Sequence, residues 1–173
     1  SPEGFRKAQR SIGLASKFDI PLITLIDTPG PNLTVEAEER GLGSAIANTM
    51  ALMAGLEVPS ISVVIGEGGS GGALALGVAD RVLMMENAIY SIISPEDAAG
   101  LIYQDEGRAD EMAESLKLTA HDCIELNIVD AVVQEPPDGA HTNPDEAARQ
   151  LRRVLLHELA ELQTMSKRRL ARE

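Results

Sequence analysis

Six of the seven residues between positions 66 and 72 are glycine or serine, and this run is the feature of the sequence with most chemical potential. It reads Gly-Glu-Gly-Gly-Ser-Gly-Gly, follows an apolar stretch and precedes a short segment of small residues. Glycine lets the backbone approach a ligand closely, and the first turn of a helix presents amides with positive partial charge. We therefore expect a loop that holds an anion, or an oxygen on which negative charge develops.

One interpretation is a dinucleotide-binding loop in a nucleotide-binding α/β module. The spacing Gly66-x-Gly68-x-x-Gly71 matches the fingerprint of such loops. Glu86 lies twenty residues after Gly66, where an acid that binds the ribose is expected. The segment 73–79 is only about two turns long, which is short for the crossover helix of that fold. The module stays open as an alternative.

A second interpretation is a serine hydrolase of the Clp/SppA type that uses Ser70 as nucleophile. A Gly-x-Ser-x-Gly pattern surrounds Ser70, and Asp130 and then His141 or His157 follow in the required chain order. The many glycines predict a loose loop rather than a tight turn at Ser70, and His141 lies in a segment rich in Pro and Gly. A Walker A loop is excluded, because no Gly-Lys-Ser/Thr follows the run.

The third interpretation is an oxyanion hole that needs no side-chain nucleophile. The backbone amides of Gly72 and Ala73, at the start of the following helix, would stabilise an enolate or a ureido oxygen as its charge develops. Such a site needs small residues without an acid or base close by, and the run fits this requirement best. A turn that packs a helix closely on a strand, with no ligand at all, is the non-functional alternative.

The elements that must position this run alternate between strands and helices. Short apolar stretches predict strands at 22–26, 58–65, 81–85, 89–93 and 131–134. Helices are predicted from Ser1 onward and over 36–54, 73–79, 95–101, 109–116, 119–127 and 144–170. Apolar strands separated by helices predict an α/β fold with a mostly parallel sheet flanked by helices. Ligands then gather beyond the carboxyl ends of the strands, here 27–30 and 66–72.

Composition narrows the class of protein. The 173 residues (18.4 kDa) are 44% hydrophobic and 24% charged, which predicts a single domain over 1–173 rather than disorder. No apolar run approaches the ~20 residues that span a bilayer, and the first residues do not resemble a signal peptide. Cys123 is the one cysteine, so we expect a cytoplasmic protein, with Cys123 in the core and no disulfide or multi-cysteine zinc site.

The formal net charge of −12 is unevenly distributed. Residues 21–148 contain four basic and 22 acidic residues, a net charge of −18, whereas both ends are net basic. An acidic centre repels phosphates, so we expect no nucleic-acid partner, and positive charge for any anionic cofactor should come from another chain. Basic residues on the last predicted helix are either solvated or dock on an acidic partner. They are Arg149, Arg152, Arg153 and 167–169.

Blocks of sequence along nearly the whole chain resemble one known family. They are PEGFRKA at 2–8, IDTPG at 26–30, AEERG at 37–41, VIGEGGSGGA at 64–73, SIISPE at 91–96, LKLTA at 116–120 and GAH at 139–141. In this order and spacing they resemble the carboxyltransferase alpha subunit of bacterial and plastid acetyl-coenzyme A carboxylase. Members normally have a further helical region before the first block, so we expect this chain to be part of a longer polypeptide.

The resemblance implies a fold, a reaction and a set of partners. The fold would be a crotonase/ClpP-like spiral of ββα units. The reaction would move a carboxyl group from carboxybiotin to acetyl-coenzyme A and form malonyl-coenzyme A for fatty acid synthesis. The partners would be a zinc-bearing beta subunit, in an α2β2 assembly, and the biotin carboxyl carrier protein. This chain would hold no metal and would work in the cytoplasm, or in the plastid stroma of a plant.

The resemblance also implies site residues. By position, the amides of Gly72 and Ala73 would be the oxyanion donors that polarise the ureido oxygen of biotin. Gly30, Gly71, Gly72 and Ala73 would bind biotin, while the beta subunit would supply most contacts to coenzyme A. Where the family usually has Ala-Tyr-Pro-Gly after the Thr-Pro-Gly block, this chain has Pro-Asn-Leu-Thr at 31–34. A loop of this kind beside biotin would keep Gly30 but present a different surface.

Overall fold

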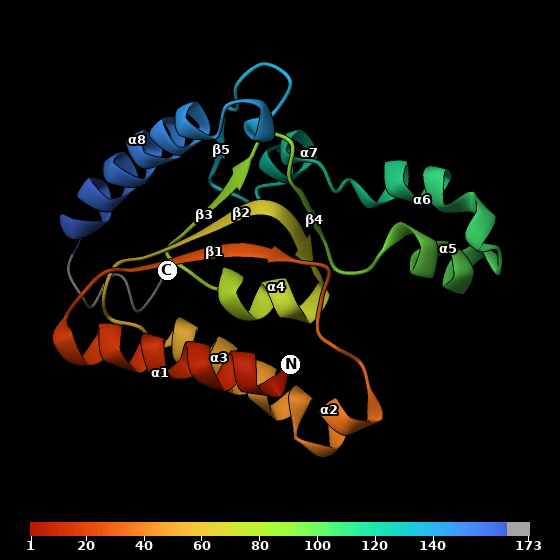
Figure 1. The fold of residues 1–173 in the computed structure, drawn as a ribbon, viewed down its shortest axis with the longest axis horizontal. Coiled ribbons are helices and arrows are strands. Elements are labelled where there is room, and N and C mark those ends of the chain that lie inside the picture. Colours follow the sequence, from red (N-terminus) through yellow and green to blue (C-terminus); the bar gives the residue numbers. More distant parts are fainter. Residues whose placement is uncertain (166–173) are drawn as a thin grey trace.

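The computed structural model describes residues 1–165 as a parallel β-sheet between two layers of helices (Figure 1). Four strands lie in the order β1-β2-β3-β5, and β4 pairs with the end of β2 outside this order. The strands are β1 (Leu22–Thr28), β2 (Ser60–Gly69), β3 (Arg81–Met85), β4 (Ile89–Ser91) and β5 (Ala131–Val133). All their pairings are parallel. The predicted α/β class, a mostly parallel sheet flanked by helices, is confirmed.

Helices cover both faces of the sheet. The α-helices are α1 (Pro2–Phe18), α2 (Val35–Glu39), α3 (Leu42–Ala54), α4 (Ser70–Gly77), α5 (Pro95–Tyr103), α6 (Ala109–Leu116), α7 (Ala120–Glu125) and α8 (Pro144–Gln163). Figure 1 shows α1, α3 and α4 on one side of the sheet and α7 and α8 on the other, while α5 and α6 project as a separate pair. No helix within residues 1–165 has the length and apolar character needed to cross a membrane.

The core lies around the two central strands, β2 and β3. Val63, Val64, Leu83 and Met84 are completely buried between the two helical layers. On the α4 side, the hydroxyls of Thr24 and Ser62 both donate to the carbonyl of Leu76, at 3.0 and 2.5 Å. These bonds satisfy a carbonyl in the last turn of α4 and fix that end of the helix on the sheet.

The two longest helices predicted with stated bounds, 36–54 and 144–170, are shorter in the structure. The helix predicted over 36–54 is interrupted at Gly41, whose φ of +75° suits glycine and separates α2 from α3. The helix predicted over 144–170 ends at Gln163 instead. The amides of Thr164 and Met165 bond three residues back, which tightens and closes the last turn. The remainder of that prediction, 166–170, lies outside the described residues.

Gly69 offers a test of the packing at the end of β2. A Cβ atom at Gly69 would overlap the carbonyl oxygen of Pro29, which belongs to the backbone and cannot swing away. We expect Gly69→Ala to lower the free energy of unfolding by about 3 kcal/mol, measured by denaturant unfolding. The matched control is Gly13→Ala, in open space within α1, which should raise it by about 0.5–1 kcal/mol. Equal stability of Gly69→Ala and wild type would contradict this packing.

Candidate functional site

The glycine run lies at the junction of β2 and α4, and no loop separates the two elements. Gly66–Gly69 stay extended because they pair with the end of β1 and with β4. The helix begins at the next residue, Ser70. The loop predicted over 66–72 is therefore wrong. The helix predicted over 73–79 is present, but it spans Ser70–Gly77. Strand pairing continues through the glycines, and the helix starts as soon as that pairing ends.

A bulge in β2 directs the strand away from β1 and β3 and towards β4. Ile26 of β1 pairs with Val64, but Thr28, two residues later, pairs with Gly68, four residues later in β2. The Oδ1 atom of Asp27 accepts a hydrogen bond from the amide of Glu67 at 3.0 Å inside this bulge. A Cβ at Gly66 would lie 2.6 Å from the same oxygen, so glycine makes room for the carboxylate. Bulges bend strands, and this one brings the end of β2 to the position where α4 begins.

The turn after β1 packs directly on the first turn of α4. Gly30 has a φ of +140°, and Thr28 Oγ1 accepts a hydrogen bond from the Gly30 amide at 3.2 Å. A Cβ at Gly72 would lie 3.0 Å from the carbonyl carbon of Gly30, tighter than most real Cβ contacts. The two strand ends expected to border a ligand site therefore lie together, at one edge of the sheet.

The first turn of α4 presents amides that have no partner within the helix. Gly69 is the N-cap, so its carbonyl accepts the first helical bond, from Ala73. The amides of Ser70, Gly71 and Gly72 are then left for other acceptors. Ser70 and Gly71 are partly exposed, Gly72 and Ala73 are buried, and no acidic residue lies in this turn. The arrangement can stabilise negative charge on an oxygen placed against the turn.

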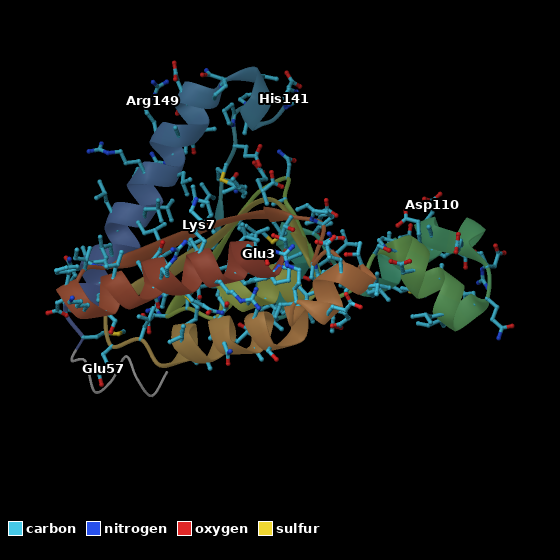
Figure 2. The ribbon with its side chains drawn as sticks, turned by 60° about the horizontal axis from the view of Figure 1, so that its bottom comes forward. Glu3, Lys7, Glu57, Asp110, His141 and Arg149 are labelled. Atoms are coloured by element: carbon cyan, nitrogen blue, oxygen red, sulfur yellow. The ribbon has the colours of Figure 1, made fainter. Side chains whose placement is uncertain are left out.

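Ser70 occupies a tight strand-to-helix turn, with φ of 52° rather than the loose loop predicted for it. A hydrolase would also need its acid and base there. Asp130 instead accepts a hydrogen bond from a β3 amide at 2.7 Å, and His157 lies on α8 beside a glutamate at 3.7 Å. Figure 2 shows His141 near the start of α8. None of them lines the cavities described below that include Ser70, so residues 1–165 do not assemble a Ser-His-Asp site there.

The geometry does not support the dinucleotide interpretation. The fingerprint needs a tight glycine turn between strand and helix, whereas Gly66 and Gly68 lie within β2. The carboxylate of Glu86, which would bind the ribose, accepts a hydrogen bond from the amide of Glu135 at 3.0 Å. It thereby joins the segments that follow β3 and β5.

Two cavities open beside the first turn of α4, and both include Ser70 and Ile92. The first, of about 460 Å³, has apolar walls that include Leu74, Leu116 and Ile128. Lys117 is the only charged residue that lines it within the described part of the chain. The second, of about 930 Å³, lies between the 29–33 turn and α5 and is lined by the acidic residues Asp97 and Glu106. A smaller space of about 280 Å³ borders Gly30 and Gly72.

Tyr90 and Lys117 shape this site, although neither belongs to a motif that predicts such a role. The Tyr90 ring fills space that two glycines leave open. A Cβ at Gly68 would lie 2.8 Å from its Cδ2 atom, and a Cβ at Gly77 would lie 2.8 Å from its hydroxyl oxygen. Tyr90 thus wedges between β2 and the far end of α4. Lys117 lies in the LKLTA block at 116–120, just before the Thr119 cap, but that block gives it no role at this site.

Cys123 and the basic residues of α8 line neither of the cavities that include Ser70. Cys123 is buried in the core, as predicted. On α8, Arg149 pairs with Glu146 at 2.8 Å and lies near Arg152 and Arg153, with Arg149 labelled in Figure 2. The basic residues 167–169 lie outside the described residues. Docking of this helix on an acidic partner stays a prediction.

Comparisons with known proteins agree on one kind of enzyme. The profile of a family described as "Acetyl co-enzyme A carboxylase carboxyltransferase-like" matches residues 1–173. The acetyl-coenzyme A carboxylase carboxyl transferase subunit alpha of Thermus thermophilus is 51% identical over 165 residues, which cover 95% of this chain and 53% of that protein. The corresponding subunit of Clostridium perfringens is 50% identical over 161 residues, which cover 93% and 59%. This chain therefore spans about half the length of the curated relatives it matches.

Solved structures show the same fold. The transcarboxylase 12S hexamer core, solved with methylmalonyl-coenzyme A, superposes with a TM-score of 0.80 at 25% identity, over 95% of this chain and 31% of that one. A Pseudomonas malonate decarboxylase hetero-tetramer in complex with coenzyme A superposes with a TM-score of 0.81 at 16% identity, over 92% and 66%. The predicted crotonase-type fold is confirmed.

The half-buried Tyr90 gives the candidate site a testable pH dependence. Burial raises the pKa of its hydroxyl above the ordinary value of 10.0, because the phenolate would lose hydration, and nearby Cys123 acts in the same direction. The folded protein holds this proton more tightly than the unfolded chain does. Its contribution to stability is therefore complete below about pH 10 and decreases as the pH rises further.

We expect the free energy of unfolding to decrease above about pH 10, and to decrease less in Tyr90→Phe, in denaturant unfolding at a series of pH values. The variant keeps the ring that fills the space beside Gly68 and Gly77, so it should fold. Parallel curves for the two proteins would contradict the assignment.

Proposed function

The chain belongs to the acetyl-coenzyme A carboxylase carboxyltransferase family, and from this premise we propose that it forms the biotin-facing half of a carboxyltransferase site. The reaction moves a carboxyl group from carboxybiotin to acetyl-coenzyme A and yields malonyl-coenzyme A, for fatty acid synthesis. One observation carries the proposal. The turn at Gly30 packs on the first turn of α4 without any intervening side chain, beside a cavity lined by Ser70 and Gly71, whose amides have no partner within the helix.

The residues present fit a flat, uncharged ring against this turn. No acidic side chain lies in the first turn of α4, and a Cβ at Gly71 would still be 3.9 Å from its nearest neighbour. Carboxybiotin, when bound, supplies the carboxyl group and a ureido oxygen on which negative charge develops. The amides of Gly71 and Gly72 donate to that oxygen, Gly71 from the side of the apolar cavity and Gly72 from the smaller space that Gly30 also borders.

Ala73 has a supporting role in this proposal. The sequence points to the Ala73 amide together with that of Gly72, but the Gly69 carbonyl accepts from Ala73 inside the helix. We assign its part to close packing, since it is completely buried beneath the donors. The helix dipole that it helps to build favours the same negative charge.

A second subunit is part of the proposal. The net charge of −18 over 21–148 is unfavourable for the phosphates of coenzyme A, so a zinc-bearing beta subunit supplies those contacts in an α2β2 enzyme. The hetero-tetrameric malonate decarboxylase is a precedent for two-subunit enzymes of this fold. The biotin carboxyl carrier protein delivers the carboxyl group. The enzyme works in the cytoplasm, or in the plastid stroma of a plant.

Gly71→Pro is the sharpest test of the amides. Proline removes one donor that has no helical partner, and a Cβ at this position has space. Within the described residues, α1, α5 and α8 have proline at their first position, one residue earlier than Gly71 in α4. In the full-length protein with a beta-type partner, we expect kcat for biotin-dependent decarboxylation of malonyl-coenzyme A to fall by about 10²–10³.

Gly71→Ala keeps the amide and should lose far less activity. Complex formation and thermal unfolding of both variants show whether the fold is retained. Wild-type kcat in a folded Gly71→Pro complex would contradict the role of the amide. A stable wild-type complex without any activity would contradict the carboxyltransferase itself.

A further inference from the structure

The apolar cavity beside α4 contains one cation that the proposed transfer of a carboxyl group leaves unexplained. Its walls are formed by Leu74, Leu116 and Ile128, and the Lys117 side chain, 60% exposed, lies at its border. Ser70 lines the same cavity and can donate a hydrogen bond from its hydroxyl. The cavity therefore combines an apolar body with a positive charge and a hydroxyl donor. This combination suits a ligand that is apolar except for one anionic group.

Lys117 is less firmly held than the other bases of the acidic segment 21–148. Each of the others has a closer carboxylate partner: Arg40 has Glu3 at 2.6 Å, Arg81 has Glu158 at 3.2 Å, and Arg108 has Glu111 at 2.6 Å. The ammonium of Lys117 is 3.8 Å from Asp122 Oδ1, beyond hydrogen-bond distance. Asp122 is itself held by the capping box of α7, where Thr119 Oγ1 donates to it at 2.6 Å. The ammonium can therefore turn to a ligand without breaking a close pair.

The charges around the cavity favour a carboxylate over a phosphate. One ammonium matches one negative charge, and no arginine lines the cavity within the described residues. Asp97 and Glu106 line the adjoining cavity, which shares Ser70 and Ile92, and they would repel a dianion. The apolar walls suit the short chain of an acyl group. In the proposed reaction, the carboxyl group distinguishes the malonyl thioester from the acetyl thioester.

We propose that Lys117 binds the carboxylate of a carboxylated acyl thioester in this cavity and so determines the preference for carboxylated over uncarboxylated acyl groups. The inference rests on the proposed function of the same site and adds the group that recognises its product. Lys117 acts as a specificity residue, since the amides of α4 already account for the developing charge. The hydroxyl of Ser70 supplies the second contact to the carboxylate.

Lys117→Gly removes the ammonium, and glycine readily adopts the backbone conformation at this position. Lys117 caps the end of α6 with φ of 53° and ψ of 52°, the left-handed conformation that glycine adopts most readily. The matched control is Gln104→Gly, because Gln104 caps α5 with φ of 56° and lines neither cavity. Both variants should unfold at or above the wild-type temperature. A loss of binding specific to Lys117→Gly then reports on the ammonium.

The test uses the full-length protein with its beta-type partner. Titration calorimetry with malonyl-pantetheine and acetyl-pantetheine compares the two acyl groups without the nucleotide phosphates. We expect Lys117→Gly to weaken binding of the malonyl compound about two- to fivefold and to leave the acetyl compound unchanged, the loss typical of one exposed charge pair. Lys117→Arg should restore much of the malonyl affinity, and Gln104→Gly should leave both affinities at wild type.

Two results would overturn the inference. Equal loss for both compounds would place Lys117 on a part of the ligand that they share, and unchanged malonyl binding would remove it from the site. The proposed function is judged separately, by malonyl-coenzyme A decarboxylation in the wild-type complex. If that activity is absent while Lys117→Gly still weakens malonyl binding selectively, the carboxylate site stands and the carboxyltransferase proposal fails.

Discussion

The contact between the turn after β1 and the first turn of α4 is the constraint on which the candidate site depends. Backbone meets backbone there, because a Cβ at Gly69 would overlap Pro29 and a Cβ at Gly72 would press on Gly30. The far end of α4 is fixed by the two hydroxyls that bond the Leu76 carbonyl. A helix held at both ends presents its free amides in one orientation. Preorganised donors of this kind stabilise developing charge without the reorganisation that water requires.

From the sequence, the class of the site can be predicted more reliably than the local backbone geometry of the site. Apolar strands and small residues after them are sufficient to locate the edge of the sheet where Gly30 and Gly72 meet. The glycines suggest a loop because glycine has a low strand propensity. The local sequence does not show which strands pair with them. Pairing with β1 and β4 overrides that propensity and carries β2 through to Gly69. In the bulge, the Glu67 amide bonds to Asp27, forty residues earlier, and no local pattern shows such a contact.

The residues that line the cavities could not be identified from the sequence either, because they meet only through tertiary contacts. Tyr90, Ile92 and Lys117 come from separate segments. Ile92 and Lys117 lie in blocks that resemble the family, but the blocks do not show that these side chains border one cavity. The glycines at 68 and 77 have their meaning only beside the Tyr90 ring, which fills the space that they leave. In the sequence alone, Gly77 is indistinguishable from a glycine such as Gly13, which faces open space. The tertiary contact decides which glycine is essential and which is replaceable.

The distribution of charge supports the proposal that the site is shared between two chains. Three of the four bases between 21 and 148 are held by close carboxylates, so this half of the site can offer a phosphate-bearing ligand little beyond Lys117. Oriented amides avoid the difficulty, because they stabilise charge that forms during reaction without attracting anions at long range. A chain that attracted coenzyme A strongly would also attract other phosphates. In the proposed enzyme, the partner subunit binds the phosphates of coenzyme A, and this chain distinguishes the acyl group that reacts.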